Sequence, residues 1–163
     1  MKLKFFAINA VVAALYTVLV IVSSPIAYGL AQFRISEMLN HLIVFNKKFF
    51  IGILGGVIIA NLFSPNGPID LLFGTGQSVV ALLTTIVCSR FVKNIKLRMV
   101  INILSFSLTM CIIAWELAII GVLGNTPFLL AWLYVAAGEF AVMAIGAPIF
   151  YLLNKRLNFA KQV

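Results

Sequence analysis

Apolar stretches fill most of the 163-residue chain, and short polar stretches separate them. A helix needs roughly 20 residues to cross a hydrocarbon core of about 30 Å. The predicted helices cover residues 5–28, 35–46, 49–63, 70–90, 97–121 and 128–154. The second and third would rise only about 18 and 22 Å, so we expect them to lie inside the bundle, to meet a thinned bilayer, or to extend into flanking residues. The pattern predicts an all-α bundle of six transmembrane helices.

Composition agrees with a membrane location. Hydrophobic residues make up 63% of the chain, charged residues only 10%, and the mean hydropathy is +1.15, whereas soluble domains are roughly 25% charged. The length suits one bundle and leaves no room for an added soluble catalytic domain. We therefore expect a single integral domain over residues 1–163 in the cell membrane, with several passes through the lipid bilayer.

The basic residues explain the net charge of +8. Alternate threading of the six helices places eleven of the twelve on one side, and Arg34 is the exception. The eleven are Lys2, Lys4, Lys47, Lys48, Arg90, Lys93, Lys96, Arg98, Lys155, Arg156 and Lys161. By the positive-inside rule this side is the cytoplasm, so both termini are expected to be cytoplasmic. The charge is a topology signal, and no nucleic-acid partner is expected.

Motifs of catalysis are absent from the sequence. No phosphate-binding GxxxxGK[ST] loop, HExxH zinc motif or GxSxG nucleophile motif occurs, and His41 is the single histidine. Cys88 and Cys111 fall in different helices, without the spacing of a metal site. We expect no enzyme activity, no cofactor and no metal, and the chain cannot be the ATPase of a pump.

Four carboxylates are the main chemical signal. Glu37, Asp70, Glu116 and Glu139 are the only acids. Threading puts the first three near the outer ends of their helices and Glu139 deeper, about 18 Å along the last span. An ionisable group at membrane depth costs roughly 2.5–3.5 kcal/mol, so it should face the bundle interior, a partner or a water-filled cavity. Polar or aromatic residues share a helix face with each acid, and an outer turn, SPNGPID, adds Asn66. The predicted substrate site comprises Arg34, Glu37, His41, Asn66, Asp70, Gln77, Glu116, Trp132 and Glu139.

Structural roles for the same residues remain open at this point. Asn102, Ser105, Thr109 and Thr84 are typical of hydrogen bonds between membrane helices. The alternatives for the site are an Arg34–Glu37 salt bridge, a helix cap at Asp70 and a packing role for His41. Thr126 is expected to be a helix cap.

Small residues form contact patterns on two helices. Ala10 and Ala14, then Ala13 and Thr17, recur four positions apart on the first helix. The third helix carries Gly52, Gly56 and Ala60 at the same interval. Such patterns let helix backbones approach closely. Spacing does not say whether the partner is internal, although internal packing is the expected role of the glycine series.

Several of these segments together resemble a known family. NAVVAALYTVLV, then QFRISEML, IANLFSP and DLLFGT, and late in the chain AAGE, are similar to the QueT family of S components of energy-coupling factor transporters. The similarity extends from about Asn9 to Pro148. It implies a six-helix membrane protein that binds a vitamin- or nucleobase-like molecule from outside. It also implies docking on an EcfT-like coupling subunit with two cytoplasmic ATPases, through Ala10 and Ala14, and a queuosine precursor as substrate.

The acid-rich site fits such a ligand. A 7-deazaguanine offers adjacent N–H donors to one carboxylate, and an aminomethyl group adds a cation for a second. Asn66 and Gln77 can complete its hydrogen bonds. Stacking partners for the ring are Trp115, Trp132, Tyr134 or Tyr28, although Trp115 and Tyr28 suit an interfacial belt better.

Other functions are compatible with the same residues. Pyridoxine or hydroxymethylpyrimidine also needs only a few polar contacts, so either is an alternative substrate. A stand-alone ion-coupled carrier would use Glu139 as its relay, and a structural subunit would use the acids only to join helices.

Overall fold

The computed structural model describes residues 2–23 and 33–163, and helices are its only regular elements over these residues. In chain order they are α1 (Lys2–Val22), η1 (Ile35–His41), α3 (Leu42–Phe45), η2 (Lys47–Phe49), α4 (Phe50–Leu62), α5 (Pro68–Phe91), α6 (Ile95–Ile119), α7 (Phe128–Leu157) and η3 (Phe159–Lys161). The prediction of an all-α fold is confirmed. Residues 24–28 of the first predicted span lie outside the described residues.

Four of the helices have the length and hydropathy to cross a membrane. They are α1, α5, α6 and α7, with 21, 24, 25 and 30 residues, which makes this chain a multi-pass membrane protein. The predicted span 35–46 is a 3-10 helix followed by one α-helical turn. The predicted span 49–63 contains the 13-residue α4, which rises about 20 Å. The count of six complete spans stays a prediction.

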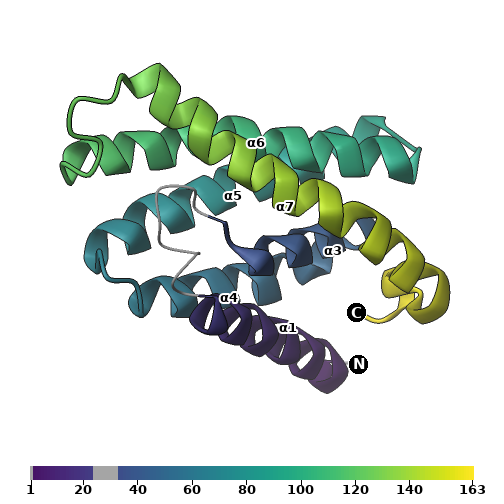
Figure 1. Ribbon diagram of the computed structural model, residues 1–163. Coiled ribbons are helices and arrows are strands. Elements are labelled where there is room, and N and C mark those ends of the chain that lie inside the picture. The colour runs from purple at the N-terminus through teal and green to yellow at the C-terminus, as the bar shows by residue number, and fades with distance from the viewer. Residues whose placement is uncertain (1, 24–32) are drawn as a thin grey trace.

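The short η1–α3 segment lies in the middle of the bundle. Figure 1 shows it between α1 and α7, and η1 contacts both of these helices as well as α6. α4 packs between α1 and α5, and α6 packs between α5 and α7. The η1–α3 segment brings polar side chains into the core, because Ser36, Glu37, Asn40 and His41 are all buried.

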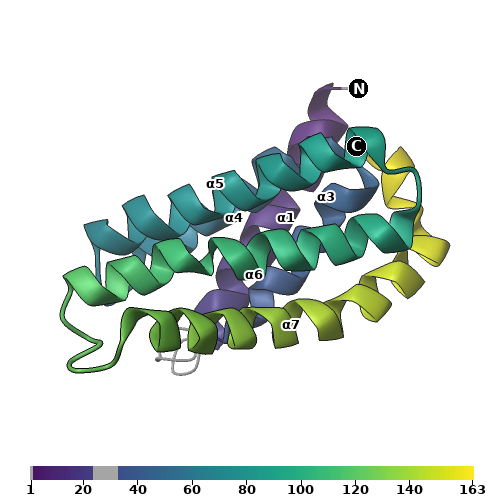
Figure 2. The same cartoon turned by 90° about the horizontal axis from the view of Figure 1, so that it is seen from above.

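One end of the bundle collects basic residues from distant parts of the sequence. Both chain ends lie there (Figure 1), as does the turn between α5 and α6 (Figure 2). Asn46 Nδ2 donates to the carbonyl oxygens of Ala160 and Val163, each at 3.1 Å. Lys96 and Lys155 lie over the ring of Tyr151. We call this end of the bundle, which carries Lys96 and Lys155, the basic end. That it faces the cytoplasm stays a prediction.

The glycine series is an internal contact, as expected. Gly52 N donates to Asn9 Oδ1 at 2.8 Å, and a Cβ atom built on Gly52 would lie 2.7 Å from the same oxygen. A Cβ atom on Gly56 would lie 2.6 Å from Tyr16 Cβ. Only glycine allows α4 to approach α1 this closely, so these positions set the distance between the two helices.

Replacing Gly56 by alanine should therefore destabilise the protein. The new methyl group meets Tyr16 Cβ, which is too near the backbone to move freely, and overpacking of this kind costs about 1–3 kcal/mol. The thermal midpoint in detergent measures the effect. Gly55→Ala is the matched control, because its Cβ would lie 3.7 Å from Ala13 Cβ, an ordinary contact. Equal midpoints for the two variants would contradict the tight approach.

Candidate functional site

The structure brings all four carboxylates into one electrostatic cluster around Arg34. Glu37 lies on η1, Asp70 on α5, Glu116 on α6 and Glu139 on α7, and each is at most 4% exposed. Arg34 is also buried, and its charge acts on every one of the four acids. We call these five residues the carboxylate cluster. The acids outnumber their cation by three, which is unusual for buried charges.

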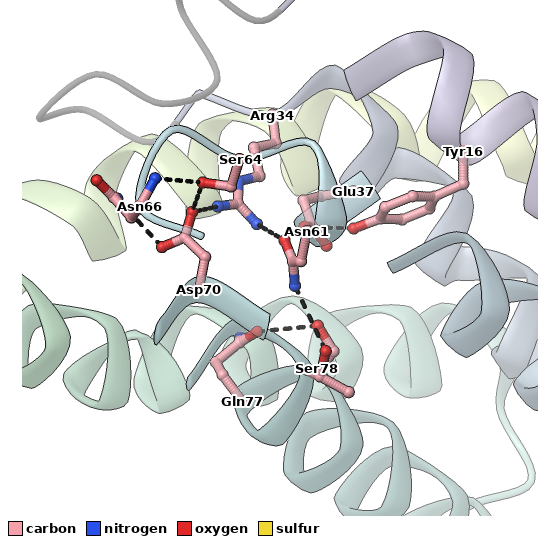
Figure 3. Close-up of polar contacts among 10 residues, drawn as sticks. Tyr16, Arg34, Glu37, Asn61, Ser64, Asn66, Asp70, Gln77 and Ser78 are labelled. Atoms are coloured by element: carbon pink, nitrogen blue, oxygen red, sulfur yellow. Dashed lines mark hydrogen bonds and ion pairs between the residues drawn. The ribbon is translucent and has the colours of Figure 1, made fainter. Parts of the chain in front are cut away.

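Asp70 is the ion-pair partner of Arg34, and both of its carboxylate oxygens accept hydrogen bonds. Arg34 Nη2 lies 4.0 Å from Asp70 Oδ2, and its Nη1 donates to Asn61 Oδ1 at 3.4 Å. Ser64 Oγ donates to Asp70 Oδ2, and Asn66 Nδ2 donates to Asp70 Oδ1 at 3.2 Å (Figure 3). Both oxygens of Asp70 are therefore used within the protein.

The turn before α5 produces this geometry. Gly67, with a φ of +62°, is the N-cap of α5, and Pro68 begins the helix, as Pro often does at the first helical position. Asp70 thus lies in the first turn, where a negative charge is favourable. The alternative that Asp70 caps the helix is wrong. Thr126 is not the cap of α7 either, because Pro127 holds that position.

Glu37 is held from two directions. Tyr16 OH on α1 donates to Glu37 Oε1 at 2.6 Å (Figure 3). Asn40 Nδ2 donates to Glu37 Oε2. The ion pair expected between Arg34 and Glu37 is replaced by the pair of Arg34 with Asp70, and Arg34 acts on Glu37 through its charge. Glu37 therefore connects η1 to α1.

Glu116 and Glu139 differ from the other two acids. Oε1 of each is buried and has no hydrogen-bond partner among the described residues. Trp132 Nε1, a donor on α7, is also buried and has no hydrogen-bond partner among the described residues. Asp70 and Arg34 are the charged neighbours of Glu116, whose carboxyl group lies within hydrogen-bond reach of that of Asp70. Glu37 and Arg34 are the charged neighbours of Glu139. More than nine in ten buried polar groups are hydrogen-bonded, so these three atoms are exceptions, as are Ser36 Oγ and Asn40 Oδ1 on η1.

His41 and Gln77, by contrast, form hydrogen bonds with neighbouring helices. His41 Nε2 donates to the carbonyl oxygen of Met143 at 2.8 Å, and Nδ1 accepts from Asn102 Nδ2 at 3.3 Å. Gln77 Nε2 donates to Thr109 Oγ1 at 3.0 Å, while its Oε1 accepts from Ser78 Oγ at 3.2 Å. The structure gives both residues packing roles, which leaves their predicted ligand contacts without support.

Polar residues between the helices show which other contacts are structural. Thr85 Oγ1 donates to Asn102 Oδ1 at 2.9 Å, which joins α5 to α6. Gln77 and Thr109 join the same two helices. The interhelical role expected for Asn102 and Thr109 is thus observed, whereas Thr84 Oγ1 bonds to Val80 O of its own helix.

Of the aromatic candidates for stacking, Trp132 is partly buried and packs against an apolar cluster that includes Leu117 and Val135. Trp115 and Tyr134 are 62% and 60% exposed, so they suit the lipid interface. Tyr28 lies outside the described residues. A recess of about 370 Å³ between α6 and α7 is lined by Tyr134 and mainly by aliphatic side chains, and none of the four carboxylates lines it.

Four residues of this polar network are not among the predicted site residues: Tyr16, Asn40, Asn61 and Ser64. Asn61 and Ser64 belong to the IANLFSP segment, and Asn61 packs so closely on Gly74 that a Cβ atom there would lie 2.7 Å from Asn61 Nδ2. The IANLFSP segment was therefore the feature of the sequence that could have pointed to Asn61 and Ser64. Tyr16 gave none, because it occurs within a run of apolar residues.

Comparison with known proteins identifies the family of the chain. The family model described as QueT transporter matches residues 6–155. The chain is 38% identical over 161 residues to a protein of Lactococcus lactis subsp. cremoris (strain MG1363) named Queuosine precursor transporter QueT, and the match covers 93% of each chain. No solved structure matches. With its four membrane-length helices, the chain belongs to the QueT transporter family and is a multi-pass membrane transporter, not an enzyme.

Proposed function

We propose that this protein binds a queuosine precursor of the 7-deazaguanine class and carries it across the membrane as the S component of an energy-coupling factor importer. The observation that carries the proposal is the set of buried atoms Glu116 Oε1, Glu139 Oε1 and Trp132 Nε1, which have no hydrogen-bond partner among the residues that the structure describes. Membership of the QueT family and the name of the Lactococcus relative support the choice of substrate.

The ligand chemistry complements the excess of carboxylates. The N1–H and the exocyclic amino group of a deazaguanine lie side by side and can donate to one carboxylate. A 7-aminomethyl group is a cation that a second carboxylate can bind by a charge-assisted hydrogen bond. Glu139 and Glu116 are the acids with a buried oxygen that accepts no hydrogen bond from the described residues. Trp132 Nε1 would donate to an acceptor of the ligand, such as its carbonyl oxygen.

The exposed face of α1 supports docking on a membrane partner. Ala10 and Ala14 are exposed, on the side of α1 that also carries Val11, Leu15 and Val18. The opposite side of the helix packs on the α4 glycines. In the proposed complex, Ala10 and Ala14 contact an EcfT-like subunit that is held by two ATPases. The basic end and both termini lie in the cytoplasm, and the substrate enters from outside.

Tryptophan fluorescence of the purified protein tests the proposal. Titration with 7-aminomethyl-7-deazaguanine should give a saturable change, because Trp132 lies at the proposed site. The Trp115→Phe variant should keep the change, since Trp115 is exposed. A response only to pyridoxine or only to hydroxymethylpyrimidine would identify that compound, and not the deazaguanine, as the substrate. No response to any of the three compounds would favour a structural subunit.

A transport assay tests the coupling mechanism separately. Proteoliposomes with this protein alone should show no uptake of the deazaguanine, and adding the coupling subunit, the ATPases and ATP should start it. Uptake by the protein alone, driven by a proton gradient, would contradict the S-component role and support an ion-coupled carrier.

A further inference from the structure

We propose that a basic recess between α3, α5 and α6 binds the phosphodiester headgroup of an anionic phospholipid. The recess has a volume of about 180 Å³, and its polar lining residues are Lys47, Ser89, Arg90 and Arg98. It lies at the basic end, where α3 contacts both α5 and α6 (Figure 2). It is separate from the carboxylate cluster, and the inference does not depend on the proposed function.

The lining residues supply donors and positive charge, and no acidic side chain is among them. All four acids of the chain belong to the carboxylate cluster, so no acidic side chain is left to pair with Lys47, Arg90 or Arg98. Arg98 Nε donates to the carbonyl oxygen of Val92, which holds the side chain in place while the other guanidinium N–H groups remain available. An anion with several acceptor oxygens suits this set.

Ser89 adds a neutral donor. Its Oγ atom is buried and has no hydrogen-bond partner within residues 2–23 and 33–163. A buried hydroxyl without a partner is unfavourable, and a phosphate oxygen in the recess would accept its hydrogen bond. Three cations from two separate turns and one orphan hydroxyl thus converge on a small polar space.

An adjoining apolar groove identifies the anion as a lipid and not a free phosphate. The groove has a volume of about 350 Å³, and its apolar lining includes Phe5, Phe50, Ile51 and Leu83. It shares Lys47 and Ile86 with the basic recess. A polar recess that continues into an apolar groove at the bundle end matches the two parts of a phospholipid. Basic pockets between membrane helices bind anionic lipid headgroups on this principle.

Lipid binding can be measured by native mass spectrometry of the full chain released from mixed micelles. The probes are phosphatidylglycerol and phosphatidylcholine with identical acyl chains. We expect the wild-type protein to retain phosphatidylglycerol preferentially. Arg90→Gln should weaken this retention roughly fivefold, in line with the attraction of one basic residue to an anionic lipid surface. Because Arg90 is exposed, the variant should fold normally.

Two variants make the test specific. Arg156→Gln removes the same charge from an exposed position on α7 outside the recess and should leave retention unchanged. Ser89→Ala should weaken the preference without any change in charge. Equal losses for Arg90→Gln and Arg156→Gln would overturn the site, because they would indicate general attraction to the surface. Full displacement of the lipid by millimolar inorganic phosphate would contradict the proposed lipid site, because it would show that the recess binds a free anion.

Discussion

Glu139→Gln should weaken binding of 7-aminomethyl-7-deazaguanine about 100-fold or more. The substitution replaces a carboxyl group whose Oε1 atom has no hydrogen-bond partner among the described residues, so in the proposed complex the ligand is its partner. Truncating one member of a buried charged pair typically costs 2–5 kcal/mol of binding. The fluorescence titration, repeated on the variant, gives the ratio of dissociation constants.

Stability distinguishes a lost contact from a damaged fold. Glu139 lies near a second buried carboxyl group, Glu37, so replacing the carboxyl group of Glu139 by an amide should leave the thermal midpoint unchanged or raise it. Glu37→Gln is the informative comparison, because both of its oxygens accept internal bonds from Tyr16 and Asn40. This variant should lose both affinity and stability. Unchanged affinity in both variants would remove the carboxylate site from the proposal.

Arg34→Gln should destabilise the protein more than any other single change considered above. Arg34 is the one cation that acts on all four acids. Breaking a buried ion pair by removing one partner costs about 3–5 kcal/mol, because the remaining charge is left uncompensated. Thermal unfolding in detergent, followed by the loss of helical circular dichroism, measures the cost.

A second substitution shows whether charge is the cause. Adding Asp70→Asn to Arg34→Gln removes the ion-pair partner and should recover part of the lost stability, which a double-mutant cycle quantifies. Lys93→Gln, an exposed change at the basic end, is the control and should have no effect. An Arg34→Gln protein as stable as wild type would contradict the view that this guanidinium holds the cluster together.

Hydropathy predicted the long helices closely. The predicted spans 70–90, 97–121 and 128–154 correspond to α5 (Pro68–Phe91), α6 (Ile95–Ile119) and α7 (Phe128–Leu157). The agreement follows from the membrane, which forces each apolar segment to satisfy its backbone hydrogen bonds internally as a helix. The segment 35–46 is less regular than predicted. Its polar side chains bond to Tyr16, Met143 and Asn102, and such tertiary contacts have no signature in a local pattern.

The structure places the four predicted acids in one cluster with Arg34. That they bind a substrate stays a prediction, and the sequence did not indicate several of their hydrogen-bond partners. Periodicity places Glu37 and His41 on one face of a regular helix, yet the two side chains bond to different elements, α1 and α7. Periodicity also cannot show that Tyr16 and Asn61 complete the polar network. Each of these two lies in an apolar stretch that reads as a lipid-facing or packing surface.

The amino-acid sequence by itself determined the helical class, the membrane location, the clustering of basic residues apart from the acids, and membership of the QueT family, because these depend on composition, order and local motifs. Only the tertiary structure decided which carboxylates are satisfied. Glu37 accepts a hydrogen bond from Tyr16 and Asp70 pairs with Arg34, both partners being distant in sequence, whereas Oε1 of Glu116 and of Glu139 finds no partner in the described part of the chain. Hydrogen bonds between buried groups depend on distances of about 3 Å, which only the packing of the helices sets.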